Sequence, residues 1–202
     1  YICVGRDPRD VALSMDNHMD NLDIPAFMAA REAAAAIDGV ELEPMIPRPP
    51  RLDDPRERFW AWVDDDRAPT EVGSSLLRTL RHLETFLHAP PELDIVLLRY
   101  EDLGRDLSGS MRELAVRLCL SVDDGALPSL VEAARFDAMR ANAAMTVPGG
   151  RTRHWKDNER FFNRGTSGQW RALLDDADLD RYRARARAIG PDDVVDWVHD
   201  DL

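Results

Sequence analysis

Two short runs of β-forming residues, each followed at once by a helical pattern, constrain the fold of this chain most. The first run, residues 1–5, leads into Asp7 and Pro8, which are typical of a helix cap and a first helical turn. The second run, residues 95–98, leads into Tyr100. This order predicts an α/β fold with parallel strands in a sheet that helices flank.

The first run stands at the very start of the chain. A buried strand of a parallel sheet normally has neighbours on both sides, so a strand that begins at Tyr1 indicates partners encoded before it. We therefore expect residues 1–202 to form the C-terminal part of one domain, incomplete at its N-terminus.

Apolar side chains at helical spacing predict the other elements. The expected helices cover residues 8–22, 23–37, 71–88, 108–120 and 128–141. Five prolines within residues 44–56 predict a surface loop. After an irregular stretch over 151–169, a last helical region is expected from Trp170 to Gly190.

The charge balance restricts the ligands. With 26 Lys and Arg against 38 Asp and Glu, the net charge is −12, which argues against nucleic acid or an anionic membrane surface as a partner. Lys156 is the single lysine, so nearly every cation is an arginine, which grips anions bidentately. The acidic net charge does not exclude a local site in which arginines bind a small anion.

The two cysteines, Cys3 and Cys119, lie far apart and form no metal-binding or disulfide spacing. This pattern predicts no metal site and favours a reducing cytoplasm. No run of 18 apolar residues occurs, so no membrane span is expected.

Ligands of parallel sheets bind at the carboxyl ends of strands, and here those ends carry Arg6 and Tyr100. Arg6 and Ser14, on the adjoining helix, offer several donors to one terminal phosphate. The alternatives are a surface ion-pair cluster after Arg6 and an ordinary helix serine. Tyr100 can present its hydroxyl to a ligand or be a half-buried strand-end tyrosine.

Two further segments carry candidate ligand contacts. Gly165 and Gly168 leave backbone N–H groups unshielded beside Arg164, which predicts an anion nest or, equally, a glycine-rich turn before a core tryptophan. Phe136 can stack on a purine with Met139 beneath it, although core packing is the commoner role of such a pair.

Taken together in this order, the motifs resemble the sulfotransferase family that uses 3′-phosphoadenosine 5′-phosphosulfate (PAPS). The similarity rests on Tyr1-Ile2 with the Arg, Pro, Asp, Val and Ser up to position 14, on Tyr100-Glu101-Asp102-Leu103, and on the loop 161–170. It covers most of residues 1–174.

The resemblance implies a P-loop-NTPase-like sulfotransferase fold and a transferase that moves a sulfo group from PAPS to a small-molecule or glycan hydroxyl. The use of arginine in place of lysine, with abundant Ala and Asp, indicates a bacterial source. Carried over by position, Arg6 and Ser14 would hold the 3′-phosphate. Tyr100 would meet the adenine edge, and Phe136 would stack on the ring. The helical region 23–92 would form the acceptor side.

The resemblance also implies that Asn163, Arg164 and Gly165 close over the 3′-phosphate. The family usually has Arg then Lys where this chain has Asn163 then Arg164. The positive charge has therefore moved by one place or been partly lost.

The family's phosphosulfate-binding loop and its usual catalytic base precede the strand that carries Arg6. No Gly-x-x-x-x-Gly-Lys occurs in this chain, so no catalytic residue is assigned within it. His18 is the one histidine near the Arg6 motif, and it would line the acceptor pocket, act as a base or be a partly exposed helix residue.

Two alternatives stay open at this stage. A P-loop-related nucleotide or sugar kinase would use the helix after Arg6 as a lid or phosphate contact. A non-catalytic interaction module would bind a partner through the helices of residues 23–140 and keep a relict phosphate site.

Overall fold

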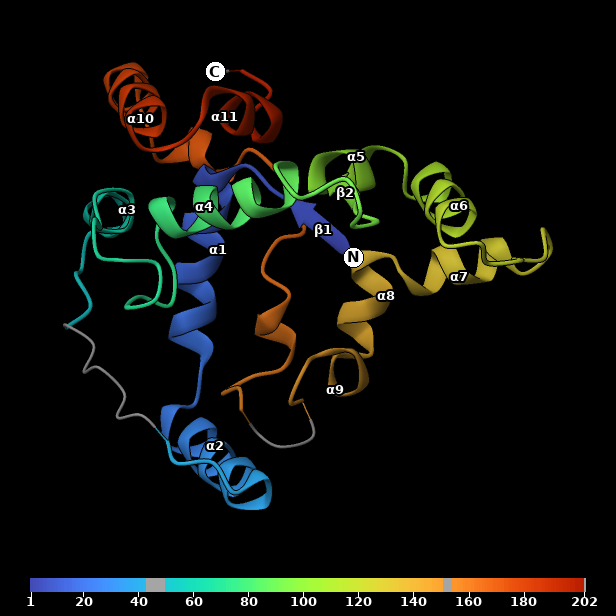
Figure 1. Ribbon diagram of the computed structural model, residues 1–202. Coiled ribbons are helices and arrows are strands. Elements are labelled where there is room, and N and C mark those ends of the chain that lie inside the picture. Colours follow the sequence, from blue (N-terminus) through green and yellow to red (C-terminus); the bar gives the residue numbers. More distant parts are fainter. Residues whose placement is uncertain (43–49, 151–153, 202) are drawn as a thin grey trace. The chain divides into compact units, whose positions relative to one another are not determined.

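The computed structural model describes residues 1–42, 50–150 and 154–201 (Figure 1). The chain divides into two compact units. The first unit comprises residues 1–15, 52–131 and 166–202, and the second comprises residues 16–51 and 132–165.

The elements follow one another as an α/β chain that is rich in helices. In chain order they are β1 (Ile2–Gly5), α1 (Pro8–Asn21), α2 (Ile24–Asp38), α3 (Pro55–Val63), α4 (Leu76–Leu87), β2 (Val96–Arg99), α5 (Tyr100–Arg105), α6 (Leu107–Arg117), α7 (Leu127–Ala133), α8 (Phe136–Ala141), α9 (Ala143–Thr146), α10 (Asp176–Ile189) and α11 (Asp192–Val198), with 3₁₀ turns η1 (Glu159–Phe161) and η2 (Gln169–Ala172).

The sheet of the first unit pairs β1 with β2 in parallel, with Ile2 opposite Val96 and Gly5 opposite Arg99. The two predicted strands are therefore neighbours, and the prediction of parallel strands flanked by helices is confirmed. Side chains of β1 alternate between exposed and buried positions, as expected for a strand with one covered face.

Helix α4 contacts β1 (Figure 1). Its start is fixed by Ser75, whose hydroxyl accepts the Arg78 N–H, and its buried face carries Leu76, Leu80 and Leu83. The predicted apolar face is confirmed, but the helix begins at Leu76 instead of residue 71 because the cap lies at Ser75.

The core of the first unit gathers apolar side chains from β1, α3, α4, α10 and α11. Its most deeply buried members include Phe59, Val63, Leu76, Leu80, Tyr182, Ala186, Val194, Val195 and Val198. The strand edge at which β1 ends lies against this core through Gly5.

The second unit is tied together by Asn21, which is fully buried at the end of α1. Its side-chain amide donates to the Asp157 carbonyl at 2.8 Å, and its side-chain oxygen accepts the Asp157 N–H at 3.1 Å. The Asn21 carbonyl also accepts the Lys156 N–H. The Asn21 side chain therefore extends the backbone pairing of this segment, where Leu22 and Trp155 form an antiparallel bridge.

Two further predicted boundaries were wrong. The predicted helix over 128–141 is two helices, α7 and α8, because Arg135 is extended (φ −66°, ψ 145°). The predicted loop over 44–56 ends earlier, since Asp54 caps α3 and Pro55 begins it. Part of that loop, residues 44–49, lies outside the described residues.

The last helical region also differs from the prediction. Trp170 lies in the short turn η2, and the long helix α10 begins only at Asp176. A reciprocal capping box between Asp175 and Asp178 sets that start. Within the described ranges, no helix has the length and apolar character that crossing a membrane requires.

Gly5 is needed where β1 meets α11. A Cβ atom at Gly5 would lie 2.3 Å from Cζ3 of Trp197 and 2.7 Å from Cη2. We predict that Gly5→Ala lowers the free energy of unfolding by about 1–3 kcal/mol through overpacking. Denaturant unfolding measures the change. Gly104→Ala is the control, because nothing lies within 4 Å of a Cβ there, and an equal loss in both variants would contradict the prediction.

Candidate functional site

The two strands end at the same edge of the sheet, and this edge carries Arg6 and Tyr100. Arg6 follows β1 directly, and Tyr100 begins α5 directly after β2. The Cζ atom of Arg6 lies 4.4 Å from the centroid of the Tyr100 ring, which is a cation–π contact. The structure thus brings these two predicted site residues together.

Only some of the N–H donors of the Arg6 guanidinium have a hydrogen-bond acceptor within the described residues. Its Nη2 donates to the Thr166 carbonyl at 3.0 Å. Its Nε is buried and has no hydrogen-bond partner within the described residues, and in the same part of the chain no carboxylate forms an ion pair with it. A buried guanidinium donor normally has an acceptor, so Arg6 has donor capacity left for an anion.

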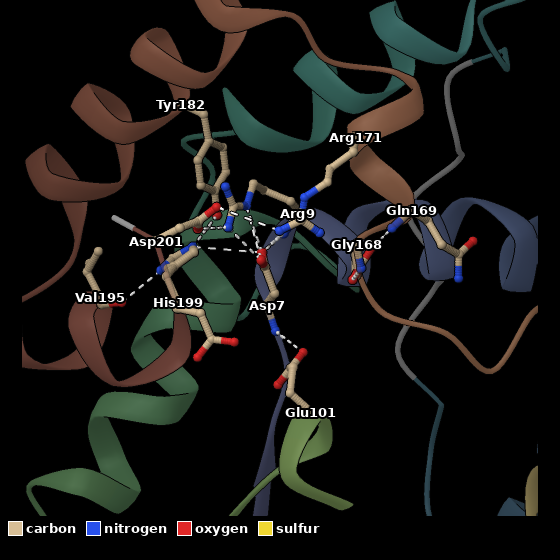
Figure 2. Close-up of polar contacts among 12 residues, drawn as sticks. Asp7, Arg9, Glu101, Gly168, Gln169, Arg171, Tyr182, Val195, His199 and Asp201 are labelled. Carbon is tan, nitrogen blue, oxygen red and sulfur yellow. Dashed lines mark hydrogen bonds and ion pairs between the residues drawn. The ribbon is translucent and has the colours of Figure 1, made fainter. Parts of the chain in front are cut away.

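The start of α1 carries a buried ionic cluster (Figure 2). Arg9 is 1 % exposed and donates to both carboxylate oxygens of Asp7 and to Asp201. Its guanidinium also lies over the rings of Trp170 and Tyr182. Burial opposes the charge of Arg9, but the bonds from Asp7 and Asp201 outweigh burial and raise its pKa.

Asp10 anchors a distant loop to α1. The Gly168 N–H donates to its Oδ2 at 2.6 Å, and the Gln169 N–H donates to its Oδ1 at 2.8 Å. The backbone N–H groups predicted as an anion nest around Gly168 therefore hold an anion of the protein itself, the Asp10 carboxylate. The predicted alternative, a surface ion-pair cluster after Arg6, was wrong, since Asp10 and Arg9 are both 1 % exposed.

His199 and Tyr182 complete the cluster from the C-terminal side. The Nδ1 of His199 lies 2.7 Å from the Val195 carbonyl, and its Nε2 lies 3.0 Å from the Tyr182 hydroxyl. A carbonyl only accepts, so Nδ1 carries the proton, and Nε2 of the neutral ring accepts from Tyr182. Burial lowers the pKa of His199 and raises the pKa of Tyr182.

Two acidic residues near the end of the chain neutralise arginines beside the strand edge. Asp200 pairs with Arg99 at 2.6 Å, and Asp201 pairs with Arg9 and, at 3.9 Å, with Arg171. Burial opposes ionisation of Asp201, but its hydrogen bond from Arg9 keeps its pKa low. These pairs fasten the C-terminal segment to the start of α1.

A small cavity lies beside this cluster, lined by residues that include Arg9, Arg99, Glu101, Ser167 and Asp201. Its volume is about 50 Å³, against roughly 300 Å³ or more for a typical small-molecule pocket. The charged groups around it therefore hold segments of the first unit together and do not enclose a nucleotide.

In the second unit, Phe136 and Gly165 are in contact. A Cβ at Gly165 would lie 2.4 Å from Cδ2 of Phe136, and the backbone there has φ +65°. Both the left-handed conformation and the close ring require glycine. Phe136 also meets the Phe162 ring edge-on, with centroids 5.7 Å apart.

The remaining predicted site residues are more open. Arg164 is exposed, Asn163 is half-buried, and Ser14 is half-buried within α1. In the part of the chain that the structure describes, no hydrogen bond joins Ser14 to Arg6. Contacts of these three residues alone do not define a site.

His18 packs among aromatic rings of the second unit. Its ring lies 4.4 Å from that of Trp155 and 5.3 Å from that of Phe161, centroid to centroid. Burial lowers the pKa of His18, which favours its neutral form. These contacts support a packed helix residue.

Sequence reasoning missed the residues that hold the site edge in place, namely Arg9, Asp10, His199 and Asp201. The available signal was the charge density of the helix start, where Asp7, Arg9 and Asp10 flank Pro8. Across residues 1–42, 50–150 and 154–201, no group of three or more His, Cys, Asp or Glu side chains is arranged to hold a metal ion.

Comparison with known proteins matches residues 1–188 to the model of the sulfotransferase domain. A glycolipid sulfotransferase of Mycobacterium bovis is 30 % identical over 208 residues, which covers 99 % of this chain and 64 % of that protein. A glycolipid sulfotransferase of Mycobacterium tuberculosis is 29 % identical with the same coverage. The chain thus spans slightly less than two thirds of these relatives.

Solved structures share the fold. Mouse sulfotransferase SULT7A1 complexed with PAP superposes with a TM-score of 0.65 at 16 % identity, over 98 % of this chain and 60 % of that one. Retinol dehydratase in complex with androsterone and inactive cofactor PAP gives 0.61 at 20 % identity, over 93 % and 46 %. The predicted P-loop-like α/β fold of sulfotransferases is confirmed.

The buried state of His199 predicts a pH-dependent stability. Because its pKa in the folded protein is below its ordinary value of 6.5, the unfolded chain binds more protons as the pH falls through that value, and folding weakens. Between about pH 7.5 and pH 5.5 the wild type is expected to lose more stability than His199→Gln. Chemical unfolding at the two pH values measures this difference.

The matched control is His82→Gln, which removes an exposed histidine from α4. The other histidines are common to wild type and variants, so their effects cancel in the difference. A His199→Gln protein with the same loss as the wild type would contradict the assignment of a neutral buried ring.

Proposed function

The chain belongs to the sulfotransferase domain family, and on that basis we propose that it carries the donor-nucleotide site of an enzyme that transfers a sulfo group from PAPS to a hydroxyl. The observation that carries the proposal is Arg6, which lies at the carboxyl edge of a parallel sheet and stacks on Tyr100, and whose buried Nε has no acceptor among the residues that the structure describes. Such an edge is the ordinary ligand position of α/β folds.

In this proposal Arg6 and Ser14 bind the 3′-phosphate of the nucleotide. An arginine fork beside a hydroxyl supplies several charge-assisted donors to one phosphate, which distinguishes a 3′,5′-bisphosphate from a 5′-monophosphate. The solved structures of similar fold were obtained with PAP bound, which supports a bisphosphate nucleotide as the ligand.

The remaining predicted residues contact the rest of the donor. Phe136 stacks on the adenine, and Tyr100 lies at its edge. Asn163, Arg164 and Gly165 close over the 3′-phosphate, with Arg164 as the cation of this segment.

The reaction sets what these residues must do. Sulfuryl transfer is physically close to phosphoryl transfer, with an in-line displacement and negative charge that develops on the departing phosphate. Binding and orienting the donor at both of its ends therefore lowers the barrier without a covalent role for the protein. The reaction scheme requires no metal ion.

The acceptor is proposed to be a hydroxyl of a small molecule or a glycan. The mycobacterial relatives are named glycolipid sulfotransferases, and this name favours a glycan hydroxyl. We place the acceptor side in residues 23–92, within one sulfotransferase-like domain that includes residues 1–202.

A bacterial cytoplasm is the proposed location. The mycobacterial origin of the relatives supports a bacterial source. Cys3 and Cys119 are both free thiols, in agreement with a reducing compartment. No nucleic acid is proposed as a partner because the chain carries a net charge of −12.

The proposed function is tested by titrating the 202-residue chain with adenosine 3′,5′-bisphosphate (PAP) and with AMP. Wild type should bind PAP more tightly, and Arg6→Ala should lose about tenfold or more of that preference, because about 1.5–3 kcal/mol is typical of a hydrogen bond to a charged group. Arg183→Ala is the control, since Arg183 pairs with Asp180 within α10. Equal binding of PAP and AMP by the wild type would contradict the proposal, and stronger stabilisation by MgATP would favour a kinase.

Phe136 is expected to act on a different part of the ligand. Phe136→Ala should weaken the binding of PAP and of AMP by the same factor, because both nucleotides carry adenine. Stacking of a base on an aromatic ring contributes about 1–3 kcal/mol to binding. Isothermal titration of both nucleotides gives the two factors. A selective loss of PAP binding would place Phe136 near the phosphate instead of the base.

A further inference from the structure

We propose that Asp10 is a positioning residue for the 3′-phosphate site, acting through the loop that follows Gly165. The inference rests on the proposed function, because it concerns how Arg6 is oriented toward that phosphate. Asp10 lies on α1 and does not itself contact the nucleotide in this proposal.

The Asp10 carboxylate has the geometry of a clamp. It is 1 % exposed, and each of its two oxygens accepts a different backbone N–H, from Gly168 at 2.6 Å and from Gln169 at 2.8 Å. Short bonds to an ionised acceptor in a buried setting are strong and directional. Two adjacent amides held in this way fix the orientation of the loop at that point.

A chain of hydrogen bonds leads from this clamp to Arg6. The side-chain amide of Gln169, whose backbone Asp10 holds, donates to the Thr166 carbonyl at 2.9 Å. The same carbonyl accepts Nη2 of Arg6 at 3.0 Å. Asp10 therefore sets where the Thr166 carbonyl lies, and that carbonyl sets the rotation of the Arg6 guanidinium over Tyr100.

The charge of Asp10 adds a second effect. Backbone N–H groups next to glycines attract anions, as the sequence already indicated for Gly168. Because the Asp10 carboxylate occupies these N–H groups, a phosphate is kept away from them. Within the described residues the buried Nε of Arg6 has no acceptor, so the clamp both orients Arg6 and directs the phosphate to it.

The test is the ratio of the dissociation constants for AMP and PAP in Asp10→Asn. Asparagine keeps one acceptor but turns an NH₂ group toward one of the two backbone donors, so one bond of the clamp is lost. We expect the ratio to fall about tenfold, the equivalent of one charge-assisted hydrogen bond of about 1.4 kcal/mol, with AMP affinity nearly unchanged. A variant that only lowers the folded fraction changes both apparent affinities alike and leaves the ratio as in the wild type.

Asp178→Asn is the matched control. Asp178 is also a buried carboxylate that accepts a backbone N–H, and it binds Arg56 and Trp60, away from Arg6. The same chemical change there should reduce stability and leave the AMP-to-PAP ratio unchanged.

Gln169→Ala provides a second variant in case Asp10→Asn does not fold. It removes the side-chain hydrogen bond to Thr166 but leaves the Asp10 carboxylate and the backbone N–H groups in place. We therefore expect the ratio of the AMP and PAP dissociation constants to fall by less than in Asp10→Asn. A wild-type chain without preference for PAP would refute the proposed function. A wild-type preference that survives in Asp10→Asn, or in Gln169→Ala where only that variant folds, would overturn the role of Asp10 alone.

Discussion

Burial of three charged residues at the start of α1 is the constraint on which the first unit depends. Ionised side chains are costly to remove from water, and they stabilise a fold only when nearly every polar atom finds a partner. Arg9 meets this condition through Asp7, Asp201 and the faces of Trp170 and Tyr182. Removing one partner of such a cluster typically costs about 3–5 kcal/mol. The strand edge, the loop before η2 and the C-terminal segment are thereby held by one cluster.

The sequence predicted those parts of the fold that local physics determines. Short runs of β-forming apolar residues located both strands, and Pro8 after Asp7 located the start of α1. The rule that ligands bind at the carboxyl ends of parallel strands then directed attention to Arg6 and Tyr100, and in the structure these two side chains are in contact. Each of these inferences needs only neighbouring residues or a general rule of chain topology.

Long-range partners could not be predicted in the same way. Asp10 and Gly168 are 158 positions apart, and no local pattern says that the carboxylate of one fills the nest of the other. The sequence is equally consistent with a glycine-rich turn and with an anion nest, and the structure combines the two: the N–H groups of the turn bind an anion from the same chain. Similarly, Arg135 breaks the helix predicted over 128–141 although the apolar spacing continues through it.

The acidic net charge and the proposed anion site are related, because in the part of the chain that the structure describes carboxylates pair with other arginines but not with Arg6. Abundant aspartates neutralise arginines throughout the described residues, among them Arg9, Arg99 and Arg185. Arg6 differs, because its guanidinium contacts a neutral carbonyl and an aromatic face and, among the described residues, forms no ion pair with a carboxylate. An uncompensated, half-buried guanidinium is costly unless a ligand supplies the missing anion. Carboxylates that pair with other arginines therefore leave few cationic sites that compete with Arg6 for a phosphate, and this makes phosphate binding at Arg6 more selective.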